Sequence, residues 1–235
     1  MSLMSPAAPI QGTVIASVEY SNGRRVGDVP LDDISDVLER QDSFVWIGLF
    51  EPNEPLLRKM QEEFGLHDLA IEDALAAHQR PKIERYDNSL FVVLRTAQIE
   101  EPKQPCEINY GEVHVFLGRN FIVTVRHGYA TSFSAVRSRA ESTPELLQQG
   151  PAFVLYTIMD FIVDQYFPIV DALGEELEGL EQRVLDESNR ILELENEVGS
   201  DAPLAAEISD LRQSMEQLER SQQREVDVGM YRHYL

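Results

Sequence analysis

The sequence predicts an α+β fold, in which a mixed β-sheet is flanked by helices on both faces (α/β/α) and is followed by long helices. Three observations support this prediction. Strand-like and helix-like segments mix irregularly over the first half of the chain, every pattern after Pro151 is helical, and 43% of the 235 residues are hydrophobic, enough for a sizeable core. The chain therefore divides into residues 1–150, an α/β/α domain, and residues 151–235, a helical region.

The first elements are two strands with a short helix between them. Thr13–Tyr20 and Phe44–Leu49 are rich in β-branched and aromatic residues and are bounded by turn residues, so each predicts a strand. Ile34, Val37 and Leu38 repeat at helical spacing between them.

Two helices follow the second strand. Asn53–Phe64 has its apolar residues on one face, and Gly65 is a typical stop. Leu66–Ala77 predicts a second helix, which must end near Arg80 because Pro81 disfavours helical geometry in the residue before it.

Three further strands complete the predicted sheet. Leu90–Ile99 is almost continuously apolar and is expected at the centre of the sheet, whereas Glu112–Leu117 and Phe121–Arg126 predict a hairpin. Because helices and strands do not alternate strictly and no glycine-rich phosphate loop is present, a doubly wound nucleotide-binding fold fits poorly.

The second half of the chain predicts an antiparallel, coiled-coil-like helical hairpin. Phe153–Phe167 is apolar on several faces and is expected to be buried. A heptad seam then runs to a break at Gly199–Pro203 and continues beyond it, which indicates two amphipathic helices joined by a short loop. The seam residues are Leu173, Leu177, Leu180, Val184, Ile191, Leu194, Val198, Leu204, Ile208, Leu211, Met215 and Leu218.

Charge and cysteine content exclude several classes of function. The chain has 20 Lys and Arg against 41 Asp and Glu, a net charge of −21, so nucleic acids and anionic membrane surfaces are poor partners and divalent cations are natural ones. The single cysteine, Cys106, excludes an intramolecular disulfide and a cysteine-based zinc site. Uninterrupted apolar runs are only strand-sized, so no membrane span is expected, and the uncapped aromatic stretch Tyr231–Leu235 is expected to continue into further sequence.

Three carboxylates are candidate metal ligands, since Mg²⁺ prefers oxygen donors. Glu72 and Asp73 are adjacent on a predicted helix and point about 100° apart, so they cannot form one tight chelate alone. They are either ordinary surface acids, or they each reach across an interface or hold a hydrated ion between helices. Asp160, with Asp164 one turn later, lies in an apolar helix, where it either faces solvent or an arginine, or else binds a metal or lies at an interface. A catalytic constellation is not evident, and His127 after a strand is interpreted as structural, so no enzyme is predicted.

The stretch Glu72-Asp73 … His78-Gln79-Arg80-Pro81-Lys82-Ile83-Glu84 resembles a segment of the CorA family of magnesium and cobalt channels. Trp46-Ile47, Phe64–His67 and Asn88–Leu94 agree with the same family, as does Tyr156–Phe167, which is similar to the helix that enters its stalk.

The resemblance implies the cytoplasmic, divalent-sensing part of a homopentameric channel, cut before two transmembrane helices that hold the full-length protein in the inner membrane. It implies Mg²⁺, or Co²⁺ and other divalent cations, bound between subunits by Glu72 and Asp73, with Asp160 as a further ligand. The family's partner aspartate follows an aromatic-arginine pair, and the similar stretch here, Tyr231-Arg232-His233, has histidine in its place.

Two alternatives remain open. The first is the cytoplasmic domain of a zinc-transporting (ZntB-like) member of the same superfamily. The second is a soluble acidic coiled-coil scaffold, because residues 171–235 carry 17 acidic and 6 basic side chains.

Overall fold

The computed structural model describes residues 13–99, 107–129, 132–197, 209–217 and 220. The chain divides into two compact parts, Met1–Gln98 with Ile108–Phe167, and Ile99–Glu107 with Pro168–Leu235. The first part contains the sheet, and the boundary falls within a helix at Pro168.

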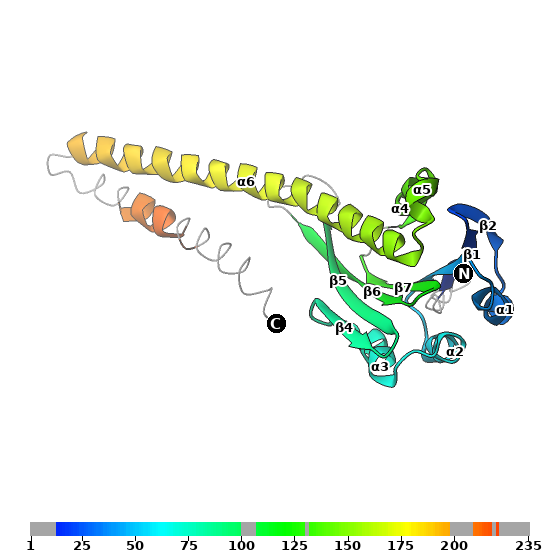
Figure 1. Ribbon diagram of the computed structural model, residues 1–235. Helices are drawn as coiled ribbons and strands as arrows, with labels where there is room; N and C mark the ends of the chain where they lie inside the picture. The colour runs from blue at the N-terminus through cyan, green and yellow to red at the C-terminus, as the bar shows by residue number, and fades with distance from the viewer. Residues whose placement is uncertain (1–12, 100–106, 130–131, 198–208, 218–219, 221–235) are drawn as a thin grey trace, which may run out of the picture. The chain divides into compact units, whose positions relative to one another are not determined.

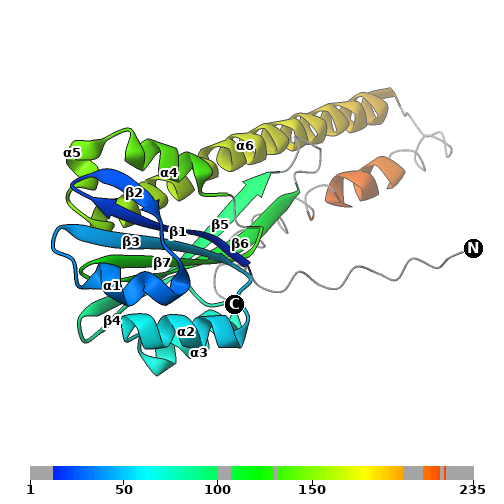
Figure 2. The same ribbon diagram turned by 90° about the vertical axis from the view of Figure 1, so that its right-hand side faces the viewer.

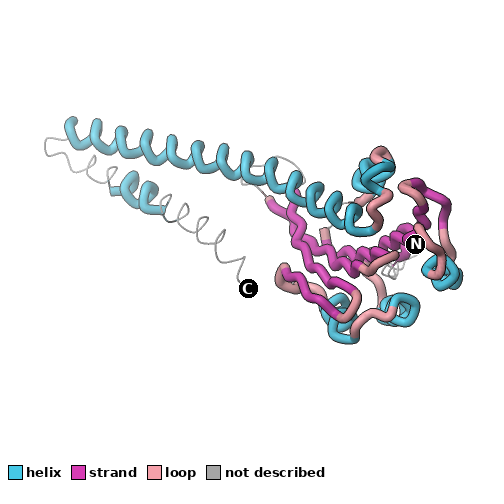
Figure 3. The backbone as a smooth tube through the Cα atoms, in the orientation of Figure 1, coloured by secondary structure: helices cyan, strands magenta, loops and turns pink. Residues whose placement is uncertain are grey.

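A seven-stranded mixed sheet forms the first part (Figure 1, Figure 3). The strand order is β2-β1-β3-β7-β6-β5-β4; β3 and β7 are parallel, and the pairs β1–β2, β1–β3, β4–β5 and β6–β7 are antiparallel. The mixed sheet is therefore confirmed. The strands are β1 (Thr13–Ser21), β2 (Arg24–Asp28), β3 (Ser43–Phe50), β4 (Lys82–Tyr86), β5 (Ser89–Ile99), β6 (Ile108–Leu117) and β7 (Phe121–Gly128).

Helices cover both faces of this sheet (Figure 2). The helices are α1 (Ile34–Leu38, after a 3₁₀ turn at Leu31–Asp33), α2 (Glu54–Phe64), α3 (Asp68–Ala76), α4 (Ser134–Glu141), α5 (Pro144–Leu147) and α6 (Pro151–Glu197). Side chains of α1, α2 and α3 pack into one core cluster, and side chains of α4, α5 and the start of α6 pack into another. The α/β/α arrangement is confirmed.

Strand β3 shows why its sequence is apolar without interruption. Its side chains alternate between faces, so Val45 and Ile47 join the cluster under α1–α3, while Phe44 and Trp46 join the cluster under α4–α6. A strand buried on both faces needs no polar alternation.

Local signals set the bounds of α2. The side chain of Asn53 accepts a hydrogen bond from the Leu56 N–H (3.1 Å), and Gly65 ends the helix at φ 60°. The predicted stop at Gly65 is confirmed, and the structure adds Asn53 as the N-cap.

Two sequence expectations were wrong. Strand β5 lies next to the edge strand β4 rather than at the centre, because burial of Phe91 and Val92 on opposite faces, and not a central position, accounts for its apolar run. The start of α6 is buried on one face only: Val154 and Ile158 are fully buried, whereas Tyr156 is 58% exposed.

Helix α6 also passes a test of length and composition for a membrane span, over Pro151–Leu194. Its most apolar 18-residue window has a mean hydropathy of 1.4 and is 28% buried within the described residues. No membrane span was expected because Asp160 and Asp164 interrupt the apolar residues of this helix. The mean hydropathy of a window stays high despite those two aspartates. Core helices of soluble proteins have the same length and composition.

The loop of the predicted helical hairpin, Gly199–Pro203, lies outside the described residues, as does Cys106. Residues 209–217 are helical, so a second helical stretch follows the long one. Antiparallel pairing of the two stays a prediction.

Candidate functional site

Helix α3 presents the two adjacent carboxylates differently. The helix begins after His67, whose Nδ1 accepts a hydrogen bond from the Leu69 N–H (3.2 Å), and its apolar face, Ala70, Ile71 and Ala74, is fully buried. This packing fixes the rotation of the helix, leaving Glu72 exposed and the Asp73 side chain 26% exposed. Asp73 is thus held at the surface by a well-packed helix.

Asp73 forms an ion pair with the lysine of the HQRPK segment. Lys82 Nζ lies 2.7 Å from Asp73 Oδ2 and 3.0 Å from Glu84 Oε2. Burial would lower the pKa of Lys82, but the hydrogen bonds to Asp73 and Glu84 outweigh it and raise that pKa above its usual value. Lys82 is therefore a fixed positive charge beside the candidate ligand.

The segment between α3 and β4 has an unusual backbone. Helix α3 ends at Ala76, and Ala77 and His78 have φ values of 47° and 57°, which non-glycine residues adopt at a cost of about 1–3 kcal/mol each. The sharp turn brings β4 back alongside β5, so that Lys82 pairs with Val93 in the sheet. Pro81 requires helix α3 to end by about Arg80, and the helix ends about one turn before that, at Ala76.

A buried network of histidines and glutamates anchors this turn. Glu112 Oε2 accepts a hydrogen bond from the Gln79 N–H (3.0 Å) and lies 2.9 Å from His114 Nε2, and Arg95 is 3.6 Å from Glu112 Oε1. Burial acts to raise the pKa of Glu112, but the bonds from His114 and Gln79, with the charge of Arg95, hold it below its usual value. Glu112 is therefore an ionised group under the HQRPK segment.

His127 extends the network to the end of α3. Its Nε2 lies 3.0 Å from the carbonyl oxygen of Ala74, and its Nδ1 lies 3.0 Å from Glu51 Oε2. A carbonyl oxygen only accepts, so Nε2 carries the proton of that bond. The structural interpretation of His127 agrees with these contacts.

The other members of this network, Glu112 and His114, were not predicted from the sequence. Glu112 and His114 lie two residues apart on the same face of β6, in an otherwise apolar stretch of the strand, and both are almost fully buried. Two polar residues spaced two apart in an apolar strand are the signal that could have indicated a buried polar pair.

The network predicts a pH dependence of stability. Burial lowers the pKa of His114, only partly offset by its bond to Glu112. The unfolded chain then binds a proton more readily, so stability is fully present above about pH 6.5 and falls as the pH drops below that value. The depressed pKa of Glu112 adds a further loss below about pH 4.5.

We therefore expect His114→Gln to flatten the decline in unfolding free energy between pH 7 and pH 5, measured by urea denaturation. His67→Asn, which removes an exposed ring but keeps a capping acceptor, should retain the decline. An unchanged slope in His114→Gln would exclude His114 as its source.

Asp160 lies elsewhere and also has a basic partner. Arg139 on α4 lies 2.6 Å from Asp160 Oδ2 and 3.9 Å from Asp164 Oδ2. Of the alternatives for Asp160, the arginine contact is thus present. Because α3 and α6 pack on opposite faces of the sheet, one chain does not bring Asp160 together with Glu72 and Asp73.

The residues described contain no group of three or more His, Cys, Asp or Glu side chains that could hold a metal ion. Within the described part of one chain, Asp73 therefore belongs to at most a partial set of oxygen ligands. Mg²⁺ usually keeps several waters and needs one or two carboxylates, so such a partial set fits one side of a shared hydrated-ion site.

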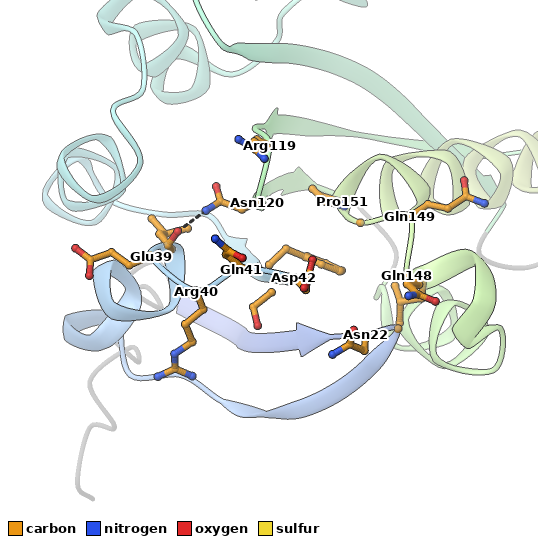
Figure 4. A pocket seen from close by; sticks show the side chains of 16 residues that line it. Asn22, Glu39, Arg40, Gln41, Asp42, Arg119, Asn120, Gln148, Gln149 and Pro151 are labelled. Carbon is orange, nitrogen blue, oxygen red and sulfur yellow. Dashed lines mark hydrogen bonds between the residues drawn. The ribbon is translucent and has the colours of Figure 1, made fainter.

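A polar cavity of about 670 Å³ lies away from the carboxylates of Glu72, Asp73 and Asp160 (Figure 4). Asn22, Asp42, Arg119 and Gln148 are among the residues that line it, and Asn120 at its wall donates a hydrogen bond to the carbonyl oxygen of Leu38 (2.7 Å). This cavity contributes nothing to the candidate metal site.

Comparisons with known proteins identify the family of the chain. The family model described as "CorA-like Mg2+ transporter protein" matches residues 41–232. The cobalt/magnesium transport protein CorA of Thermotoga maritima is 30% identical over 158 residues, which is 66% of this chain and 44% of that protein. The chain thus spans less than half the length of this curated relative.

Two solved structures share the fold. The soluble domain of CorA from Methanocaldococcus jannaschii aligns with a TM-score of 0.51 and 18% identity, covering 92% of this chain and 94% of that one. The ZntB cytoplasmic domain from Vibrio parahaemolyticus aligns with a TM-score of 0.51 and 12% identity, covering 94% and 99%. Since the family model covers most of the sequence, the chain belongs to the CorA-like Mg²⁺ transporter family.

Proposed function

We propose that this chain is the cytoplasmic, divalent-cation-sensing part of a CorA-like transporter for Mg²⁺ and Co²⁺. Residues 1–150 form its sheet domain, and residues 151–235 form a helical stalk that leads to membrane helices. Metal bound between subunits, by Glu72 and Asp73 and separately by Asp160, regulates the transport of ions. The observation that carries the proposal is the family match over residues 41–232, together with the position of Asp73 at the surface beside the HQRPK segment.

The ligand chemistry supports a shared site. A carboxylate that is only a quarter exposed and belongs to a rigid helix is suited to one side of a hydrated-ion site. A net charge of −21 makes subunits repel one another, and a divalent ion between facing carboxylates replaces that repulsion with attraction. Bound ion would therefore favour the closely associated arrangement of a homopentamer.

The start of α6 supports association with further copies of the chain. Tyr156, Met159, Val163 and Phe167 follow one another at helical spacing and are between 39% and 61% exposed. An apolar stripe of this kind marks an interaction surface, and Asp160 lies one turn from both Tyr156 and Val163. A metal at Asp160 would then lie at a subunit boundary.

Regulation requires only that the two states differ in their affinity for the ion. A site occupied at roughly a hundredfold excess over its dissociation constant stabilises its state by about 2.7 kcal/mol, so a few sites shift a gate by several kcal/mol. Emptying the sites when Mg²⁺ falls would loosen the closed state.

Ion uptake by the full-length protein tests this proposal. We expect uptake of Mg²⁺ and Co²⁺ to exceed uptake of Zn²⁺, and Asp73→Ala to keep transporting when the internal Mg²⁺ concentration is high. Asp36→Ala, which removes an equal charge from an exposed position on α1, should be inhibited like the wild type. Preferential Zn²⁺ uptake would favour the ZntB-like alternative, and inhibition of Asp73→Ala at the wild-type Mg²⁺ concentration would contradict sensing through Asp73.

A further inference from the structure

Both Asp73 and Asp160 already hold a cation that belongs to the chain. Lys82 Nζ lies 2.7 Å from Asp73, and a guanidinium nitrogen of Arg139 lies 2.6 Å from Asp160. A metal ion that approaches either carboxylate meets a positive charge that is covalently tethered beside it. The Lys82–Asp73 pair is the better defined of the two, because the fold fixes the positions of both residues.

The backbone directs Lys82 toward Asp73. Lys82 is the first residue of β4, and its pairing with Val93 holds it in the sheet. Its ammonium lies 5.8 Å from the centre of the Phe91 ring, which orients the side chain further. Asp73 is held from the other side by the buried face of α3, so the contact joins two well-fixed elements.

The same ammonium is shared with a second carboxylate. Glu84 Oε2 lies 3.0 Å from Lys82 Nζ, and Glu84 also accepts a hydrogen bond from the Tyr86 hydroxyl (2.8 Å). Lys82 therefore has an alternative anionic partner one pleat along β4 when Asp73 engages another cation. A lysine with two acceptors can give up one of them without being left unpaired.

From this geometry we infer that Lys82 is a tethered competitor of the divalent cation at Asp73, and that it sets the affinity of the site. The inference rests on the proposed function, because it needs an ion at Asp73. A divalent ion on the Asp73 carboxylate either displaces the Lys82 ammonium toward Glu84 or is repelled by that ammonium at short range. Both outcomes weaken binding of the ion. A sensor responds near its dissociation constant, so Lys82 moves the response to higher ion concentrations.

The test compares ion binding by Lys82→Met with that by the wild-type chain, using calorimetric titration with MgCl₂ and with CoCl₂ at constant ionic strength. Methionine keeps the length of the stem and removes the charge. We expect the dissociation constant to fall about fivefold in Lys82→Met and to change less than about twofold in Lys82→Arg. Lys59→Met is the matched control, because Lys59 also pairs with an aspartate, Asp32, but on other elements.

The outcomes separate the inference from the proposed function. Unchanged or weaker binding in Lys82→Met, with binding still reduced by Asp73→Ala, overturns the role of Lys82 and leaves the proposed function standing. Equal binding by the wild type and Asp73→Ala overturns the proposed site itself. Should Lys82→Met melt below the wild type in NaCl, Lys82→Gln provides the same loss of charge, and a fivefold tightening there supports the inference equally.

Discussion

Replacing Glu112 by alanine is expected to lower the free energy of unfolding by about 3 kcal/mol, because it breaks a buried charged network by removing one partner. The change leaves His114, which is fully buried and already has an unpaired Nδ1, without a partner for Nε2. It also removes the acceptor of the Gln79 N–H and the carboxylate beside Arg95. Urea denaturation at pH 7 measures the loss.

A matched control separates this effect from a simple change of net charge. Glu62→Ala removes an exposed carboxylate from α2 and should change the unfolding free energy by less than about 0.5 kcal/mol. Equal losses in the two variants would show that the network under the HQRPK segment contributes nothing to stability.

Asp73→Ala is expected to abolish the part of the divalent-ion stabilisation that comes from the site at Glu72 and Asp73, and to leave the part that comes from Asp160. At roughly a hundredfold excess over the dissociation constant, that stabilisation is about 2.7 kcal/mol for one site. In NaCl alone the same variant should lose only about 0.2–1 kcal/mol, because a partly exposed pair such as Asp73–Lys82 is worth little. Melting in MgCl₂ and in NaCl separates the two effects.

The control for Asp73→Ala is Asp36→Ala, which should keep the full divalent response. If both variants respond to MgCl₂ like the wild type, the stabilisation does not pass through Asp73. If both lose the response equally, the ions act on the overall charge of the chain rather than at one site.

Elements with local signals could be predicted from the sequence. Helix α2 has both a capping Asn53 and a terminating Gly65, and β3 has a run of residues that only burial on two faces explains. Edge strand β2, Arg24–Asp28, was missed because its side chains are mostly exposed and polar and show no alternation. Gly23, at φ 72°, makes the tight turn before it.

Properties that depend on distant residues could not be predicted in the same way. Glu51 and His127 are 76 residues apart and meet only because β3 and β7 are parallel neighbours. The apolar run of β5 encodes burial on two faces, which a strand near an edge can also have. The partners of Asp160 and Asp73 were equally hidden, since a sequence shows a carboxylate but not which cation faces it.

The candidate site was likewise predictable only in part. The HQRPK segment and its acidic neighbours were identified by resemblance, and the structure adds the pairing of Lys82 with Asp73. The stretch Tyr231-Arg232-His233, which is similar to the family's cross-subunit partner but has histidine in place of aspartate, lies outside the described residues.

The most direct test of divalent sensing is the melting temperature of the wild-type chain in increasing MgCl₂, compared with NaCl at matched ionic strength. Screening of 21 net negative charges raises stability in either salt alike. A site for the ion predicts a further rise in MgCl₂ that saturates. A rise that NaCl reproduces in full would contradict the account, because the acidic surface would then be screened without being recognised.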